Sequence, residues 1–93
     1  MSHFVYILKS LKNTKIKTYV GYTNNLKRRL VLHNKGKGAK STRGRKWKII
    51  YTEKFSTKSE AISREYYIKK NRKFRNFIRK SLNEKRYSNF TTL

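Results

Sequence analysis

A tyrosine, an arginine and a histidine stand close together in one stretch of the sequence, at Tyr19, Arg29 and His33. The stretch starts as a predicted strand and continues as a helix whose apolar stripe is formed by Leu26 and Leu30. At about 100° per residue, Arg29 and His33 lie beside this stripe. The pattern predicts that the three side chains converge on one pocket. The alternative is a solvated basic helix in which His33 is only a core residue.

Hydrolysis of a phosphodiester in such a pocket would leave two negatively charged oxygens to be stabilised, which a hard divalent cation often helps to do. Such a cation prefers carboxylate ligands. The chain has no aspartate and four glutamates, at Glu53, Glu60, Glu65 and Glu84. Glu60 forms a capping-box pattern with Thr57, Glu84 lies in the polar tail, and Glu53 lies near the end of a strand, where solvent is close.

Glu65 is the carboxylate that remains as the candidate metal ligand. On its predicted helix it falls in the apolar stripe, among Ala61, Ile62 and Ile68. A carboxylate that faces a core is costly unless it is paired or bound to a metal. The alternative is a structural salt bridge from Glu65 to a lysine or an arginine.

The charge of the chain is strongly unbalanced. Its 93 residues include 26 lysines and arginines and four acids, for a net charge of +22. Such a chain repels itself and polyanions relieve the repulsion, so nucleic acid is the expected partner. A membrane is not expected as a partner, because the basic residues form no single amphipathic helix with a bulky apolar face. The charge alone would fit a ribosomal-type protein equally well.

Length and residue usage indicate one small folded domain. A chain of 93 residues has one domain as its prior and buries roughly 60–65% of its unfolded surface. Without cysteine, neither a disulfide nor a thiolate metal site can form. The early apolar run Phe4–Leu8 is too short for a signal peptide or a membrane span. We therefore expect a cytoplasmic protein with a domain over residues 1–83 and a polar tail over 84–93.

Alternation and helical periodicity predict three strands and three helices. The strands are His3–Lys9, Lys17–Tyr22 and Trp47–Phe55, and the helices are Asn24–Asn34, Thr57–Lys70 and Arg72–Leu82. The first two strands are expected to pair antiparallel through a loop at Ser10–Lys15, which would bring Tyr6 near Tyr19.

Periodicity also assigns side chains to faces and ends of these elements. One face of the third strand is expected to carry Trp47, Ile49, Tyr51 and Phe55. The apolar stripe of the last helix is expected to comprise Phe74, Phe77, Ile78 and Leu82. Thr23 or Asn24 is the expected N-cap of the first helix, and Gly36 its C-terminal stop.

The segment Lys35–Lys46 has low complexity, with three glycines among basic residues. It suits a mobile loop that follows a phosphate backbone, and the alternative is a solvated linker. The expected contacts to nucleic acid are made by Lys35, Lys37, Lys40, Arg43, Arg45 and Lys46.

Five separated motifs occur in order along the chain. They are Val5-Tyr6-Ile7-Leu8, Tyr19-Val20-Gly21, Asn25-Leu26-Lys27-Arg28-Arg29 with His33, the loop from Gly36 to Arg45, and Arg64-Glu65 before Tyr66-Tyr67-Ile68-Lys69. Together they resemble the GIY-YIG nuclease superfamily, in particular its small stand-alone bacterial branch, which is related to the UvrC and intron-endonuclease domains. The resemblance covers roughly residues 3–82. Phe4 replaces the usual glycine of the first motif, and the late asparagine of many relatives is not assigned among Asn71, Asn76 and Asn83.

The resemblance implies a metal-dependent DNA endonuclease with an α+β fold, a three-stranded antiparallel sheet flanked by helices in the order ββαβαα. It implies that Tyr6 acts as general base or orients the attacking water, with Tyr19 holding water or phosphate beside it. Arg29 would hold the scissile phosphate, and His33 would hydrogen-bond the site or relay a proton. Glu65 would hold one Mg²⁺ or Mn²⁺. Nearby cations are expected to lower the pKa of Tyr6 from its usual value of about 10.

A second function remains open, that of a non-catalytic basic nucleic-acid-binding protein, either a degenerate relative or a ribosome-associated protein. Sheet packing alone is the corresponding alternative for the two tyrosines. The complete set of five candidate residues favours the endonuclease, because a degenerate relative is expected to have lost at least one. The sequence leaves open the preference for DNA or RNA, the substrate structure, a role in DNA repair or recombination, and the oligomeric state, for which a monomer is the default.

Overall fold

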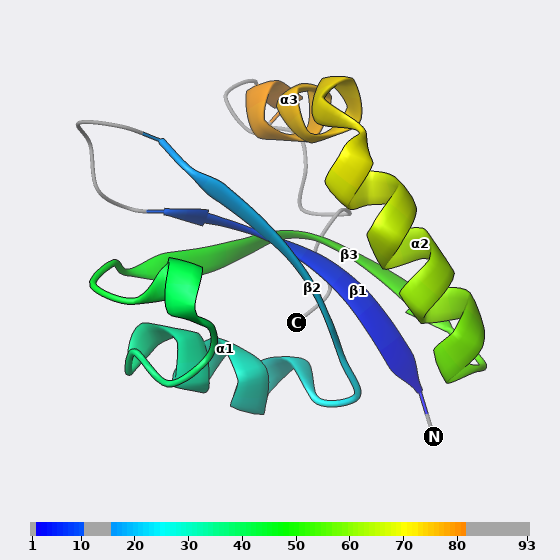
Figure 1. Cartoon of the computed structure of the whole chain (residues 1–93), viewed down its shortest axis with the longest axis horizontal. Helices are drawn as coiled ribbons and strands as arrows, with labels where there is room; N and C mark the ends of the chain where they lie inside the picture. The colour runs from blue at the N-terminus through cyan, green and yellow to red at the C-terminus, as the bar shows by residue number, and fades with distance from the viewer. Residues whose placement is uncertain (1, 11–15, 82–93) are drawn as a thin grey trace.

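The computed structural model describes residues 2–10 and 16–81. In chain order the elements are β1 (His3–Ser10), β2 (Thr18–Thr23), α1 (Leu26–Asn34), the 3₁₀ turn η1 (Lys40–Thr42), β3 (Trp47–Phe55), α2 (Lys58–Lys70) and α3 (Arg72–Ser81). The predicted α+β fold and its ββαβαα order are confirmed (Figure 1). Predictions for the loop residues 11–15, for Leu82, Asn83 and Glu84, and for the tail 84–93 lie outside the described residues.

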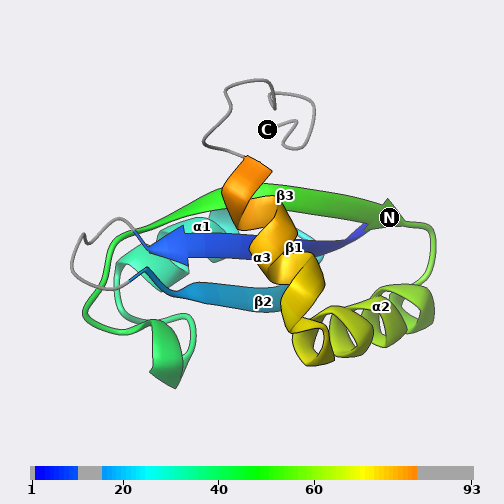
Figure 2. The same ribbon diagram turned by 90° about the horizontal axis from the view of Figure 1, so that it is seen from above.

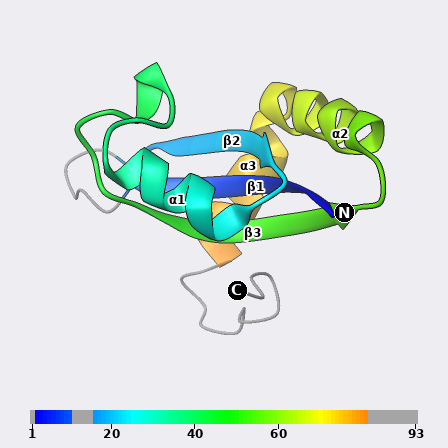
Figure 3. The ribbon, with the colours of Figure 1, turned by 90° about the horizontal axis from the view of Figure 1, so that it is seen from below.

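The three strands form one antiparallel sheet in the order β2-β1-β3. Helix α1 covers one face of this sheet, and α2 and α3 cover the other (Figures 2 and 3). Strand β1 lies in the middle, so both of its faces are buried, as its continuous apolar sequence predicts. Val5 and Ile7 pack with α2 and α3, whereas Tyr6 and Leu8 pack on the side of α1. The alternation of β1 therefore sends Tyr6 toward α1.

The assignment of Trp47, Ile49, Tyr51 and Phe55 to one face of β3 is wrong. The pairing of β3 with β1 shifts between Ile7 and Leu8, where the partner residues are Tyr51 and Ile49. One extra residue, Ile50, is thus accommodated, and a bulge of this kind reverses the faces that follow it. Trp47 and Ile49 pack on the α1 side, whereas Tyr51 and Phe55 pack on the α2 side with Ile50.

The ends of the helices follow their local sequence with one correction. Asn25, and not Thr23 or Asn24, caps α1, and its Oδ1 accepts a hydrogen bond from the backbone N–H of Arg28 at 3.1 Å. Gly36 follows α1 with a φ of 77°, which confirms the expected glycine stop. Thr57 caps α2 and hydrogen-bonds Glu60, as predicted.

The apolar stripe of α3 is narrower than predicted. Ile78 is buried and Phe74 packs against the core, but the side chain of Phe77 is 61% exposed. Across residues 2–10 and 16–81, no helix has the length and apolar character to cross a membrane.

Candidate active site

Tyr6 is the buried centre of the site, on the middle strand of the sheet. It is 1% exposed and lies opposite Gly21 of β2. A Cβ atom at position 21 would collide with the phenol of Tyr6, so the close approach requires glycine. The ring of Tyr19 lies beside it, with 6.4 Å between the two ring centroids. The predicted proximity of Tyr6 and Tyr19 is therefore confirmed.

Helix α1 brings Arg29 and His33 to the same hydroxyl. The Tyr6 oxygen lies 2.8 Å from Nε2 of His33, and Nε of Arg29 donates to it at 3.3 Å. The rings of Tyr19 and His33 are 5.0 Å apart between centroids. Arg28, one residue before Arg29, is exposed. The helical phase predicted from Leu26 and Leu30 is confirmed, and four of the five candidate side chains meet at one place.

The hydrogen bonds of Thr42 fix the direction of every bond in this cluster. The Thr42 hydroxyl donates to the carbonyl oxygen of Ala39 at 3.0 Å, so toward Nδ1 of His33, 2.9 Å away, it can only accept. Nδ1 of His33 therefore carries the proton, and Nε2 of the neutral ring is an acceptor. The Tyr6 hydroxyl donates to that Nε2 and accepts from Arg29.

Both central groups are held neutral. Burial raises the pKa of Tyr6 to about 12, although the hydrogen bond and the charge of Arg29 act to lower it. Burial, with the nearby charge of Arg29, lowers the pKa of His33 to about 4. The expectation that nearby cations lower the pKa of Tyr6 is wrong for this structure, because removal from water outweighs the single guanidinium in contact.

The segment after α1 is folded against the site, and its mobility stays a prediction. Thr42 is buried, and its carbonyl accepts from the indole Nε1 of Trp47 at 2.8 Å. The carbonyl of Gly38 accepts from Nη2 of Arg29 at 3.3 Å, and a Cβ at position 38 would collide with His33. The basic side chains that remain exposed are Lys35, Lys37, Lys40, Arg43 and Lys46, whereas Arg45 is half-buried.

Thr42 and Gly38 are site residues that the sequence reasoning missed. Both lie in the segment interpreted as low-complexity, where repeated lysines and glycines hide individual positions. The available signal was a β-branched residue, Thr42, within the uncharged pair that separates Lys40 from Arg43.

Glu65 lies on α2 with a side chain that is 17% exposed, and its Oε2 is 3.1 Å from Nζ of Lys69. The alternative of a salt bridge from Glu65 to a lysine is therefore the contact that the structure shows. Ile62, assigned to the same stripe, is exposed. Burial is the largest cause of the raised pKa of Tyr6, and the negative charge of Glu65 is a smaller cause in the same direction.

In the part of the chain that the structure describes, Glu65 could bind a divalent cation only together with ligands from outside the protein, such as water and phosphate. Among the described residues, no group of three or more His, Cys, Asp or Glu side chains could enclose a metal ion. Mg²⁺ often binds through one carboxylate together with waters and substrate phosphates. Glu65 fits that role once Lys69 turns away from it.

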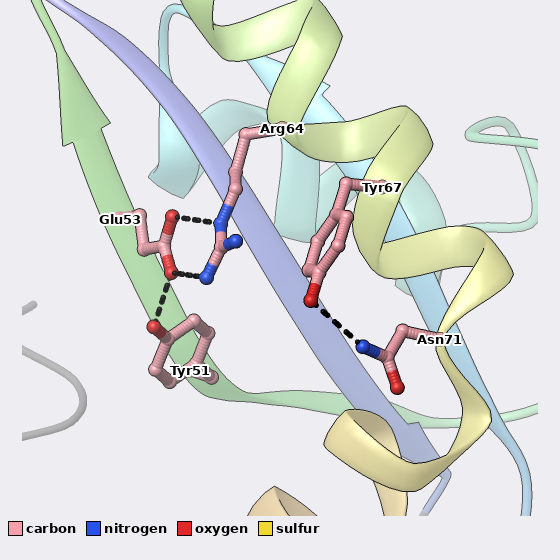
Figure 4. A network of polar contacts seen from close by, with 5 residues as sticks. All are labelled: Tyr51, Glu53, Arg64, Tyr67 and Asn71. Atoms are coloured by element: carbon pink, nitrogen blue, oxygen red, sulfur yellow. Dashed lines mark hydrogen bonds and ion pairs between the residues drawn. The ribbon is translucent and has the colours of Figure 1, made fainter.

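The other described carboxylates and Asn71 have structural contacts elsewhere. Glu53 accepts from Nε and Nη2 of Arg64 at 2.8 and 3.0 Å and from the Tyr51 hydroxyl (Figure 4). Asn71 accepts from the backbone N–H of Phe74 at 3.0 Å, so it caps α3.

Comparison with known proteins identifies relatives over nearly the whole chain. The GIY-YIG catalytic domain matches residues 2–83. A UPF0213 protein of Clostridium perfringens is 48% identical over 89 residues, covering 91% of this chain and 92% of the relative. A UPF0213 protein of Oceanobacillus iheyensis is 52% identical over 68 residues, covering 72% and 76%. The solution NMR structure of a UPF0213 protein from Bacillus halodurans is 38% identical, with a TM-score of 0.52 over 100% of this chain and 97% of that one.

Proposed function

Because the chain belongs to the GIY-YIG catalytic domain family, we propose that it is a metal-dependent endonuclease that hydrolyses phosphodiester bonds in DNA. The observation that carries the proposal is the buried hydroxyl of Tyr6, held between a guanidinium donor and an imidazole acceptor. Sheet packing alone does not require a phenol with a proton acceptor on one side and a cation on the other. With DNA as substrate, the proposed place of action is the cytoplasm, in DNA repair or recombination.

Arg29 is the proposed phosphate-binding group. Its Nε and Nη2 are used by Tyr6 and Gly38, which fixes the plane of the guanidinium. The remaining N–H groups of the fork are donors suited to phosphate oxygens. A phosphate bound there lies next to the Tyr6 hydroxyl, with the ring of Tyr19 at its side.

Tyr6 and His33 provide a path for the proton of the attacking water. As the water oxygen bonds to phosphorus, its proton moves to the oxygen of Tyr6 while the Tyr6 proton moves to Nε2 of His33. The bond from phosphorus to the leaving oxygen breaks, and that oxygen takes a proton from solvent. Arg29 is one cause of the low pKa of His33, so a phosphate that offsets its charge raises the proton affinity of His33.

Glu65 is the proposed ligand of Mg²⁺ or Mn²⁺. When bound, such an ion supplies positive charge to the phosphate and the leaving oxygen. The phosphate of the substrate would complete the ligand set, which one protein carboxylate alone does not fill. The proposed role of Lys69 is to neutralise Glu65 while no nucleic acid is bound.

A panel of labelled single-stranded, duplex, flapped and branched DNA tests the proposal, with Mg²⁺, with Mn²⁺ and with EDTA. We expect metal-dependent cleavage that EDTA abolishes and that a Tyr6→Phe protein, prepared in parallel, does not show. The parallel variant separates this activity from a contaminating nuclease. Tight binding without cleavage of any substrate would instead support the non-catalytic nucleic-acid-binding protein, which the pairing of Glu65 with Lys69 favours.

A further inference from the structure

Two neighbouring tyrosines at the C-terminal part of α2 are directed to solvent. Tyr66 is 61% exposed and Tyr67 is 51% exposed. With Lys70, Asn71, Arg72 and Lys73 they line a hollow of about 490 Å³ at the junction of α2 and α3. Large exposed aromatic side chains grouped in one hollow indicate a binding surface.

The ring of Tyr67 is exposed but is held in place by contacts with Arg64 and Asn71. The guanidinium of Arg64 lies 4.9 Å from its ring centroid, and Nδ2 of Asn71 donates to its hydroxyl at 3.0 Å. Arg64 is itself fixed by its two hydrogen bonds to Glu53, which also accepts from Tyr51 (Figure 4). A ring that is already ordered loses little conformational entropy when a ligand binds.

The surroundings of the tyrosine pair are cationic. Nζ of Lys70 lies 4.4 Å from the ring centroid of Tyr66. Lys70, Arg72 and Lys73 line the hollow, and no acid is among its lining residues. Aromatic rings that stack on bases, flanked by cations that contact phosphates, are the features that bind single-stranded nucleic acid. The bases of a duplex are already stacked on one another, so the ligand must carry unpaired bases.

We propose that Tyr66 and Tyr67 form a binding site for unpaired bases of single-stranded nucleic acid. Lys69 and Arg75 line a second hollow of about 240 Å³ together with Tyr19 of the candidate active site. Lys69 directly precedes Lys70 on α2, so we expect a strand bound at Tyr19 to pass these cations on its way to the tyrosine pair. Binding at the tyrosine pair is independent of catalysis. Only the corollary, that the cleaved substrate has a single-stranded segment next to the scissile bond, rests on the proposed function.

Fluorescence anisotropy in EDTA, with a labelled oligothymidylate and a duplex of the same length, tests the proposal without cleavage. The double variant Tyr66→Ala/Tyr67→Ala removes both rings, and Tyr66→Phe/Tyr67→Phe is the matched control that keeps the rings and removes the hydroxyls. We expect the alanine pair to weaken single-strand binding by roughly 5- to 150-fold per stacked base. Duplex binding should remain unchanged. The phenylalanine pair keeps both rings and loses only the hydrogen bond from Asn71 to Tyr67, so it should lose far less affinity than the alanine pair.

Three results would overturn the proposal: no loss for the alanine pair, an equal loss on the duplex, or an equal loss for the phenylalanine pair. A concentration-dependent dimer that the alanine pair abolishes, with single-strand binding unchanged, would assign the surface to a second copy of the chain. If the double variant does not fold, Tyr66→Ala alone serves, because Tyr66 is outside the network around Arg64. A protein that cleaves nothing but shows the expected binding pattern would refute the proposed function and keep this site.

Discussion

At the scale of single residues, the chemistry of the site depends on which nitrogen of His33 carries the proton. The Tyr6 hydroxyl meets Nε2 as a donor only because Nδ1–H is bound to the Thr42 hydroxyl, whose own proton goes to Ala39. Thr42 hydrogen-bonds the imidazole of His33, whereas the hydrogen bonds of the Tyr6 hydroxyl are to His33 and Arg29. Thr42 is a positioning residue, which acts through the imidazole.

Thr42→Val should lower turnover while leaving substrate affinity unchanged. Valine has nearly the shape of threonine but offers no acceptor to Nδ1–H, so the proton can move to Nε2 and the Tyr6 hydroxyl loses its acceptor. Loss of such an orienting partner typically costs about 10- to 100-fold. Steady-state rates with ¹⁵N chemical shifts of the His33 ring measure both effects. Thr42→Ser should restore the rate, and equal behaviour of the valine and serine variants would contradict this role.

The protein should lose stability as the pH falls from about 6.5 toward 4. The folded state lowers the pKa of His33 to about 4, while the unfolded chain has the ordinary value of about 6.5. Between these values the unfolded state binds more protons, so acid favours unfolding. Urea unfolding from pH 7.0 to 5.5 avoids most of the glutamate titration. A His33→Gln variant should show a flatter dependence, and an equally steep one would disprove the assignment to His33.

At the scale of elements, periodicity predicted the features that depend on the sequence of a single strand or helix. The strands, the helices and the face of α1 that carries Arg29 all follow from local pattern. The bulge at Ile50 could not be predicted, because it depends on the register between β3 and β1. The pair of Arg64 with Glu53 joins different elements and leaves no local signal. The pair of Glu65 with Lys69 is the exception, since a glutamate four residues before a lysine is a readable helical pattern.

The exposed cations of the segment between α1 and β3 should contribute to affinity for nucleic acid and not to the rate of chemistry. We expect the quadruple alanine variant of Lys37, Lys40, Arg43 and Lys46 to flatten the slope of log K against log salt by roughly 0.7–0.9 per lost phosphate contact. The matched control replaces Lys17, Lys48, Lys54 and Lys80, which are also exposed. Equal slopes for the two quadruple variants would remove the segment from the nucleic-acid interface.

The variant Glu65→Gln, on helix α2, tests the proposed metal ligand. Cleavage with Mg²⁺ should fall by about 10²-fold or more, with DNA binding retained. Stability should change little, because an i,i+4 ion pair with a half-exposed lysine contributes only about 0.3–0.5 kcal/mol. The partner variant Lys69→Gln should lower the Mg²⁺ concentration required for cleavage. If Glu65→Gln cleaves at the wild-type rate and Mg²⁺ does not shift the thermal melt of the wild-type protein, Glu65 is not a metal ligand.

At the scale of the whole molecule, the excess of positive charge far exceeds what the fold neutralises. The net charge is +22, and two of the three acids that the structure describes are engaged by Arg64 and Lys69. The charge therefore predicts affinity for nucleic acid, and it does not distinguish a nuclease from a binding protein. The buried cluster around Tyr6 is the feature that supports the proposed nuclease. Composition predicted the partner, whereas the specific chemistry needed the fold that joins β1, α1 and η1.

The rates of Arg29→Ala and Arg28→Ala under single-turnover conditions, with saturating protein and Mg²⁺, test the catalytic role of this cluster most directly. The two arginines are adjacent and carry the same charge, but only Arg29 reaches the Tyr6 hydroxyl, while Arg28 is exposed. We predict that Arg29→Ala cleaves about 10²-fold or more slowly, the scale of losing one transition-state donor, and that Arg28→Ala cleaves at the wild-type rate. Equal rates for the two variants, whether both fast or both slow, would contradict the account.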